Sequence, residues 1–278
     1  MSDLTADKTR DLVREHYANV STKNVGCAPG CCGAMPAGQS LSLGYTEGDL
    51  AAVPEGADLG LGCGNPNAIA ALKPGETVLD LGSGGGFDAF LAARAVGPTG
   101  RVIGVDMTPE MISRARDNAR KVSASNVEFR LGEIEHLPVA DQTVDAIMSN
   151  CVINLSPEKE SVFREALRVL KPGGRLAISD VVAIAPIPPE LQTQAAALAG
   201  CISGATPLDE LKQLLAKVGF VDIEVTITPQ SAEIVESWLA GASAFIASAT
   251  IEARRHDPDA KQASAKASSA CCPPGCCP

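Results

Sequence analysis

The chain has 278 residues, of which 45% are apolar, 3% are aromatic and 20% are charged, and its net charge is −10. A chain of this length can bury the apolar core of one large domain, or of a core domain with an appendage. The negative charge argues against nucleic acid and anionic membranes as partners, and the scarcity of aromatic residues argues against a base-stacking surface.

The N-terminal residues are charged and polar, and no apolar run in the chain approaches the length of a membrane span. We therefore expect a cytoplasmic protein, in a compartment where thiols are kept reduced. In that compartment, ten cysteines indicate metal binding or catalysis rather than structural disulfides.

The first 70 residues predict two helices separated by loops. Helical spacing covers 5–17, a loop rich in cysteine and small residues covers 25–38, and a short helix covers 45–54. The glycine loop "LGLGCGNP" follows and places Cys63 between two glycines. Glycines in such a loop could hold the backbone so that the sulfur points at a ligand.

From Lys73 the pattern changes to alternating strands and helices. Short apolar runs predict strands over 76–82, 100–107, 126–133, 143–154 and 175–184, and the segments between them predict helices over 87–97, 108–122 and 156–174. Thr108 and Ser156 are expected as helix caps because each is followed by proline at the first helical position. This alternation predicts an α/β fold with a doubly wound, Rossmann-like parallel sheet.

The C-terminal part predicts helices over 189–205 and 207–220, with Gly219 ending the second helix, and one more strand over 221–228. The polar end of the chain reads as disordered and finishes in "CCPPGCCP". We therefore divide the chain into an N-terminal helical and Cys-rich segment (1–70), a core (71–185), a C-terminal α/β appendage on the substrate side (186–250) and a disordered Cys-rich tail (251–278).

The glycine-rich turn "LDLGSGGGFD" lies where the first predicted strand of the core turns into a helix. Glycines there let the backbone approach a ligand at the carboxyl edge of the sheet. The dinucleotide fingerprint requires glycine at position 87, which is Phe87. Asp106 ends the next strand, where a carboxylate can accept hydrogen bonds from both hydroxyls of a ribose.

The D-x-G-x-G-x-G spacing that starts at Asp80 resembles the S-adenosylmethionine-dependent methyltransferases of class I. The resemblance implies S-adenosylmethionine as methyl donor, and it implies that the loop "GEIEHLP" after the third strand contacts the adenine. Asn150 could orient substrate or cofactor, or could simply end its strand. The expected cofactor-binding residues are Asp80, Gly82, Ser83, Gly84, Asp106, Met107, Glu133, Ile134 and Asn150.

Three isolated cysteines are expected near the same edge of the sheet. Cys151 lies near the carboxyl end of the fourth strand, Cys63 precedes the first strand, and Cys201 follows the fifth. A single such cysteine is most often a small buried apolar residue, but three thiols could converge over the methyl group of the cofactor. Three soft thiol ligands without histidine suit a thiophilic centre such as trivalent arsenic. Asp180, at the end of the fifth predicted strand, is expected to be a structural cap.

The segments "GLGCGNP", "VLDLGSGGGFD", "FRLGEIEHLPV", "SNCVINLSP" and "GCISGA" are similar to those of the arsenite S-adenosylmethionine methyltransferases, and the match covers about residues 41–227. The resemblance implies that Cys63, Cys151 and Cys201 bind arsenic(III) and that arsenite and methylarsenite are substrates. It also implies that Cys31 or Cys32 exchanges disulfides with Cys63 to reduce the pentavalent product, and that thioredoxin or glutathione restores the thiols.

Two other functions remain open from the sequence. The chain could methylate another small organic substrate with structural cysteines, or it could be a thiol-rich protein that sequesters arsenic or another metal. The tail cysteines Cys271, Cys272, Cys276 and Cys277 could capture arsenite or be dispensable. We expect a monomer without nucleic-acid or membrane partners.

Overall fold

The computed structural model describes residues 5–23, 39–188, 201–202 and 204–259. Its centre is a sheet with the strand order β3-β2-β1-β4-β5-β8-β7, and β6 pairs with β5 beside this path. The strands pair in parallel except where β8 meets β5 and β7. The strands are β1 (Thr77–Leu81), β2 (Arg101–Asp106), β3 (Val127–Leu131), β4 (Val144–Asn150), β5 (Leu170–Ala183), β6 (Thr206–Pro207), β7 (Phe220–Ile227) and β8 (Ile246–Arg255).

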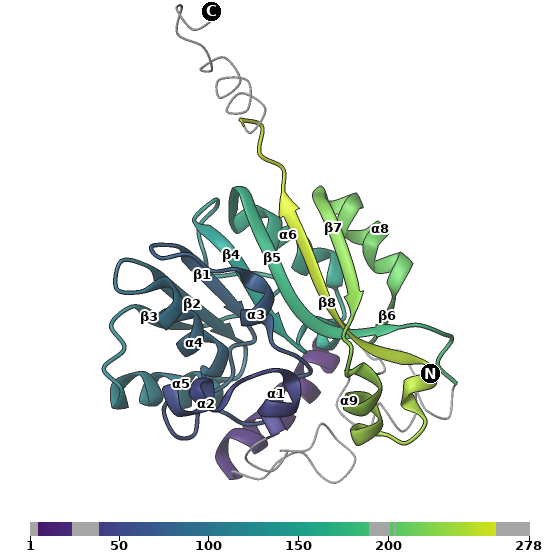
Figure 1. The fold of residues 1–278 in the computed structure, drawn as a ribbon, viewed down its shortest axis with the longest axis horizontal. Helices are drawn as coiled ribbons and strands as arrows, with labels where there is room; N and C mark the ends of the chain where they lie inside the picture. The colour runs from purple at the N-terminus through teal and green to yellow at the C-terminus, as the bar shows by residue number, and fades with distance from the viewer. Residues whose placement is uncertain (1–4, 24–38, 189–200, 203, 260–278) are drawn as a thin grey trace, which may run out of the picture.

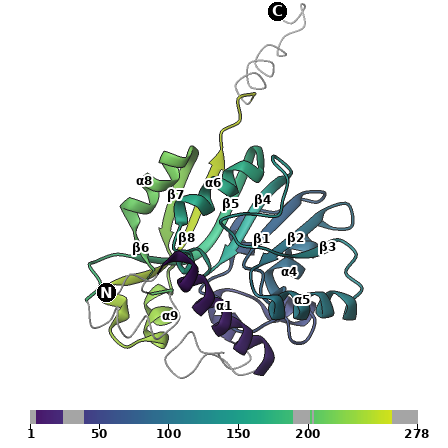
Figure 2. The same cartoon turned by 180° about the vertical axis from the view of Figure 1, so that it is seen from behind.

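Helices cover both faces of the sheet, as Figures 1 and 2 show from opposite sides. One buried cluster joins α6 and α8 to the sheet, and another joins α3, α4 and α5 to the opposite face. The helices are α1 (Ala6–Lys23), α2 (Glu47–Ala52), α3 (Pro66–Ala70), α4 (Phe87–Val96), α5 (Pro109–Lys121), α6 (Lys159–Val169), α8 (Leu208–Val218) and α9 (Ser231–Trp238), with short 3₁₀ turns at Gln39–Leu43, Ile153–Leu155 and Ala242–Ala244. None of the helices that the structure describes is long and apolar enough to cross a membrane.

The parallel strands end at one edge of the sheet, where α1 and α9 lie in both views and α2 lies in Figure 1 (Figures 1 and 2). The strand order reverses between β1 and β4, which are neighbours in the sheet although β2 and β3 lie between them in the chain. Ligands of open α/β sheets bind outside the carboxyl ends of the strands at such a reversal. This edge is therefore the expected position of a ligand-binding site.

The predicted fold class is confirmed, and so are the strands and most helices of the core. Helix α5 begins at Pro109 after Thr108, as expected for proline at the first helical position. Gly97 and Gly219 end α4 and α8 with positive φ, a conformation that costs glycine little.

Several helix boundaries were predicted wrongly, and residues 170–174, predicted as the end of a helix, are the first part of β5. Helix α1 continues past Tyr17 to Lys23, and α6 begins at Lys159 with Glu158 as its cap. The Ser156 hydroxyl does not cap α6; it accepts a bond from the Glu158 N–H and donates to Glu135. A long-range hydrogen-bond partner therefore displaces the start of the helix by one half-turn.

Strand β8 was not predicted, and it joins the C-terminal region to the core. It lies between β5 and β7, so β6, β7 and β8 belong to the same sheet as β1 to β5. The proposed tail boundary at residue 251 falls inside β8, and Ile251 and Ala253 are buried in the core. The predicted helix over 189–205 lies outside the described residues except at its end, where Cys201 and Ile202 form a turn.

Candidate active site

A pocket opens at the carboxyl edge of the sheet, over the reversal between β1 and β4. It takes residues from the glycine turn after β1, from the ends of β2 and β4, from the Cys63 loop and from α1. The cofactor residues predicted from the sequence that line it are Asp80, Gly82, Ser83, Gly84, Asp106, Met107, Ile134 and Asn150. Cys151 lines the same pocket.

Two buried polar atoms of this pocket, Asp80 Oδ2 and Ser83 Oγ, have no hydrogen-bond partner among the described residues. Burial raises the pKa of Asp80 well above its ordinary value, and the carboxylates of Asp88 and Asp106 raise it further. Unpaired buried polar atoms are costly, and neighbouring carboxylates repel each other. A ligand with hydrogen-bond donors and positive charge would relieve both costs.

The backbone of the glycine turn leaves room for that ligand. Gly82 and Gly84 both have positive φ, and a Cβ added at Gly84 would meet no atom within 4 Å. The carboxylate of Asp106 accepts hydrogen bonds from the N–H groups of Gly84 (3.0 Å) and Thr108 (2.8 Å). These bonds fix the Asp106 side chain against the glycine turn.

The loop after β3 lies between the pocket and α1. Ile134 and Glu135 line the pocket, whereas Glu133 is not a lining residue and pairs with Arg14 of α1. Sequence reasoning missed Glu135. The nearly buried Arg10 of α1 bonds Glu135 and Glu158, so α1 is held across the pocket by ionic contacts.

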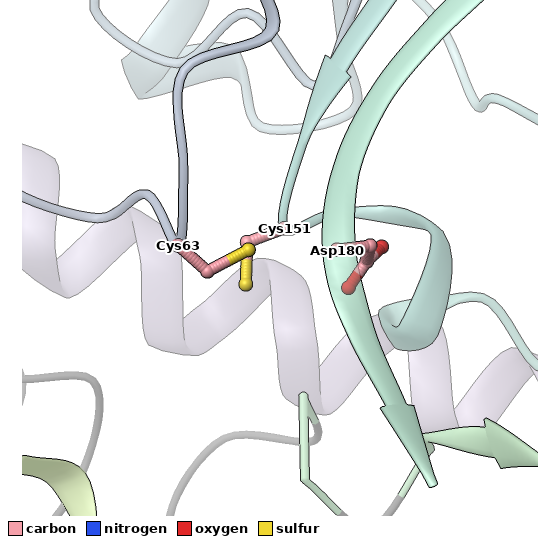
Figure 3. A group of neighbouring side chains, drawn as sticks. All are labelled: Cys63, Cys151 and Asp180. Carbon is pink, nitrogen blue, oxygen red and sulfur yellow. The ribbon is translucent and has the colours of Figure 1, made fainter. Parts of the chain in front are cut away.

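The structure brings Cys63 and Cys151 together. The sulfur atoms of these cysteines and a carboxylate oxygen of Asp180 all lie within 4.8 Å of one another. Figure 3 shows the two thiol side chains meeting from a loop and from the end of β4, with Asp180 beside them on β5. All of these side chains are buried: Cys63 is 0% exposed, Cys151 is 3% exposed and Asp180 is 2% exposed.

Three strands hold the Cys63 backbone and side chain in place. Its N–H donates to Asn150 Oδ1 at the end of β4 (3.0 Å), and its thiol donates to the Ser179 carbonyl on β5 (3.4 Å). Its own carbonyl accepts from Ser248 Oγ on β8 (2.7 Å). The loop therefore has a defined position although it has no regular secondary structure.

Cys201 packs in the same buried cluster as the other two cysteines, but it is not part of the three-residue group with Asp180. Its thiol donates to the Cys151 carbonyl (3.4 Å). A hydrogen bond with the Cys201 thiol lowers the pKa of Cys151, but the Cys63 thiol, burial and the charge of Asp180 outweigh it, and the pKa lies well above its ordinary value. Cys151 is therefore a neutral thiol at pH 7.

A network of buried polar side chains joins the thiols to the cofactor pocket. The Asn150 amide group donates to Asp88 Oδ2 (3.2 Å) and to the Gly64 carbonyl (2.9 Å), and the Tyr45 hydroxyl donates to Asp88 Oδ1 (2.6 Å). Sequence reasoning missed Tyr45 and Asp88, because nothing local marks a lone tyrosine and a helix-start aspartate as partners. Cys31, Cys32 and the tail cysteines lie outside the described residues.

The comparisons with known proteins agree with this geometry. Residues 72–219 match the family model described as a methyltransferase domain. The chain is 53% identical over 268 residues to an arsenite methyltransferase of Halobacterium salinarum, covering 92% of this chain and 68% of that protein. It is 41% identical over 219 residues to an arsenite methyltransferase of Aquipseudomonas alcaligenes, covering 76% of this chain and 61% of that protein.

Among solved structures, the chain resembles CrArsM, an arsenic(III) S-adenosylmethionine methyltransferase from Chlamydomonas reinhardtii. The TM-score is 0.59 at 34% sequence identity, covering 81% of this chain and 75% of that one. The extent of the match to the Halobacterium protein, together with the methyltransferase domain model, shows that this chain belongs to the arsenite methyltransferase family.

Proposed function

We propose that this chain transfers methyl groups from S-adenosylmethionine to trivalent arsenic held by Cys63, Cys151 and Cys201. The observation that carries the proposal is the approach of the Cys63 and Cys151 sulfurs within 4.8 Å, with Cys151 lining the pocket, in a chain of this family. The hydrogen bond from the Cys201 thiol to the Cys151 carbonyl, and the place of Cys201 in the same buried cluster, support the third ligand.

Arsenite would enter the site as As(OH)₃. Each of the three thiols replaces one hydroxyl: an S–H bond and an As–O bond break, an As–S bond forms, and one water molecule leaves. Neutral thiols such as Cys151 supply the protons that the departing hydroxyls need. Soft thiolate ligands suit the soft arsenic centre, which keeps one lone pair.

The residues of the pocket would orient the two reactants. Asp80, Ser83 and Asp106 would hold S-adenosylmethionine, and the unpaired Asp80 and Ser83 oxygens fit a ligand with amino and hydroxyl groups. When bound, this donor supplies an electrophilic methyl group on a sulfonium. Because Cys151 lines the same pocket, arsenic on its sulfur would lie beside the methyl group. The arsenic lone pair would form the new As–C bond as the C–S bond of the donor breaks, and the electron pair of that bond would stay on the donor's sulfur.

No general base is required for this step, because the nucleophilic lone pair carries no proton. The contribution of the chain is to bring the two reactants together in a buried site. Holding two reactants in a reactive geometry lowers the barrier because the reaction no longer depends on their chance encounter. The three carboxylates Asp80, Asp88 and Asp106 favour a cationic donor over the neutral product that remains after transfer.

We further propose that a vicinal thiol, Cys31 or Cys32, reduces the pentavalent product together with Cys63. The thiol of Cys31 or Cys32 would attack the arsenic-bound sulfur of Cys63. The S–H and As–S bonds break, an S–S bond forms and the proton leaves to solvent, while arsenic keeps the electron pair of the As–S bond and returns to the trivalent state. Thioredoxin or glutathione would then reduce the disulfide, and this requirement favours a reducing compartment such as the cytoplasm.

The test is to supply labelled S-adenosylmethionine, arsenite and a thiol reductant and to separate the arsenic species formed. Labelled methylated arsenic is the expected product. Stoichiometric arsenite binding without methylated product would favour a thiol-rich binding protein. Unchanged turnover in Cys151→Ser and Cys201→Ser, with label in an organic product, would favour another methyltransferase substrate.

A further inference from the structure

Asp180 is a buried carboxylate next to the thiol site that the proposed mechanism does not use. It lies inside β5, three residues before the strand ends at Ala183, so it does not end the strand as predicted from the sequence. One of its oxygens is within 4.8 Å of the Cys63 and Cys151 sulfurs. Its position raises the question of whether it binds the substrate or holds the site.

The hydrogen bonds of Asp180 answer this question. Oδ2 accepts from the backbone N–H groups of Ile153 (3.0 Å) and Asn154 (3.3 Å). Oδ1 accepts from the Asn154 amide (2.9 Å) and from the Val181 N–H (2.7 Å). A carboxylate has about four acceptor positions, and donors already occupy these, so Asp180 is a poor ligand for arsenic.

The segment that Asp180 holds begins at Cys151, directly after β4. Cys151 has φ +59°, in the left-handed region that residues with a Cβ rarely adopt. Such a conformation persists only where the surroundings determine it, and it is common at functional sites. The Cys151 N–H donates to the Ser179 carbonyl (2.8 Å) on β5, the strand that also carries Asp180.

Asn154 completes the connection to β5. Its amide group donates to Asp180 Oδ1 and to the Val181 carbonyl (2.6 Å), and its side chain is buried. Consecutive residues of β5 therefore hold consecutive parts of the turn: Ser179 holds Cys151, and Asp180 and Val181 hold Ile153 and Asn154. Lys159 of α6 is another neighbour of Asp180, and its positive charge lowers the pKa of the carboxylate.

We propose that Asp180 and Asn154 are positioning residues that hold the Cys151 backbone in its left-handed conformation, so that its thiol lies beside that of Cys63, in the buried cluster that also contains Cys201. This inference rests on the proposed function, because it explains how Cys151 is held in place as an arsenic ligand. It assigns Asp180 no bond to arsenic and no part in proton transfer.

The variants Asp180→Asn and Asn154→Ala test the proposal. An amide at position 180 has one acceptor oxygen for four donors, and alanine at position 154 removes both side-chain hydrogen bonds while keeping the backbone. Asp145→Asn and Asn126→Ala are the matched controls: Asp145 bonds Lys171 and the Thr77 N–H at the opposite end of β4, and Asn126 bonds the carbonyls of Ala93 and Gly97.

We expect arsenite affinity to fall by about tenfold or more in Asp180→Asn and Asn154→Ala, while affinity for S-adenosylmethionine and the unfolding midpoint stay near those of the controls. X-ray absorption at the arsenic edge should show fewer sulfur neighbours than in the wild type. Wild-type arsenite affinity and sulfur count in both variants would overturn the proposal. So would an arsenic–oxygen contact that only Asp180→Asn loses.

A second measurement does not depend on arsenic. Cys151 is buried in the wild type, so iodoacetamide should label it slowly, and labelling followed by mass spectrometry should be faster in both variants than in the controls. Unchanged labelling would count against the positioning role. Failure of the wild type to bind arsenite would contradict the proposed function, whereas the labelling result would still decide the role of Asp180 and Asn154. Should Asp180→Asn fail to fold, the milder Asn154→Ala decides alone.

Discussion

The Cys63 N–H donates a 3.0 Å hydrogen bond to Asn150 Oδ1, although the two residues are 87 positions apart in the chain. The same Asn150 side chain donates to Asp88 and to the Gly64 carbonyl. One amide group therefore fixes the loop that presents the Cys63 sulfur and connects it to the first turn of α4, at the wall of the cofactor pocket.

Gly62→Ala should disrupt this connection. A Cβ at Gly62 would lie 2.6 Å from Asn150 Nδ2, so the loop or the amide must move. We expect the KM for arsenite to rise by about tenfold, which corresponds to the loss of one buried hydrogen bond, with a smaller rise in the KM for S-adenosylmethionine because Asn150 also lines the cofactor pocket. Gly48→Ala is the control, because its Cβ would make only an ordinary 3.5 Å contact with Thr46. Equal kinetics in the two variants would contradict this role of the loop.

Asp80→Asn should weaken cofactor binding while stabilising the protein without ligand. Burial raises the pKa of Asp80, so its ionised form is less stable in the folded chain than in the unfolded chain. The folded chain therefore holds this proton more tightly, and stability falls as pH rises from the unfolded pKa to the folded one. At neutral pH the neutral amide removes this cost, and it also removes a charged acceptor for the cofactor.

Calorimetry should accordingly give an affinity for S-adenosylmethionine about 10 to 100 times weaker in Asp80→Asn. Thermal unfolding without ligand should give a midpoint equal to or above that of the wild type. Asp145→Asn serves as the control for a carboxylate remote from the pocket. A lower midpoint together with unchanged affinity would mean that Asp80 is structural.

Arsenite binding should exchange almost no protons with solvent near pH 7. The raised pKa of Cys151 keeps it a thiol, and each thiol proton leaves in water with an arsenite hydroxyl. Titrations in buffers of different ionisation enthalpy should therefore give the same heat.

Above the thiol pKa, thiolates would have to take up protons on binding, so affinity should fall as pH rises. Proton uptake near one per arsenite at pH 7 would show that a thiol is already ionised. Arsenite binding to dithiothreitol, whose thiols are free in solution, is the reference for proton exchange in the same buffers.

The chain should tolerate truncation after residue 259 but not after residue 250. The shorter form loses the half of β8 that pairs with β5 and β7 and carries the buried Ile251. Its unfolding midpoint should fall by about 10 °C or more, since a domain of this size loses about 2–4 °C for each kcal/mol. The longer form should unfold like the full chain. A stable, active form ending at residue 250 would contradict the role of β8 in the sheet.

The core was predictable because its signals are local. Proline at position 109 and glycines at 97 and 219 mark helix ends by backbone chemistry that no distant contact overrides. Strand β8 was not predictable, because its sequence "IASATIEARR" is rich in alanine and polar residues, which are uncommon in strands. Pairing along both of its edges, with β5 and β7, holds it inside the sheet instead.

The candidate site also has one part that the sequence predicted and one part that it did not. The ends of parallel strands meet at one edge, so the placement of Cys151 near the glycine turn followed from the strand pattern. The roles of Asn150 and Asp180 depend on hydrogen bonds to loops far along the chain, which no spacing reveals. In the loop after β3, both glutamates bond arginines of α1, but Glu135 also lines the pocket and Glu133 does not, and only the folded backbone distinguishes these neighbours.

The most direct test of the central claim is the number of sulfur atoms bound to arsenic. X-ray absorption at the arsenic edge, on the wild type with one equivalent of arsenite, should show three sulfur neighbours, and Cys201→Ser should show two. Two sulfurs and one oxygen in the wild type, unchanged in Cys201→Ser, would show that Cys201 is not a ligand and would contradict the account.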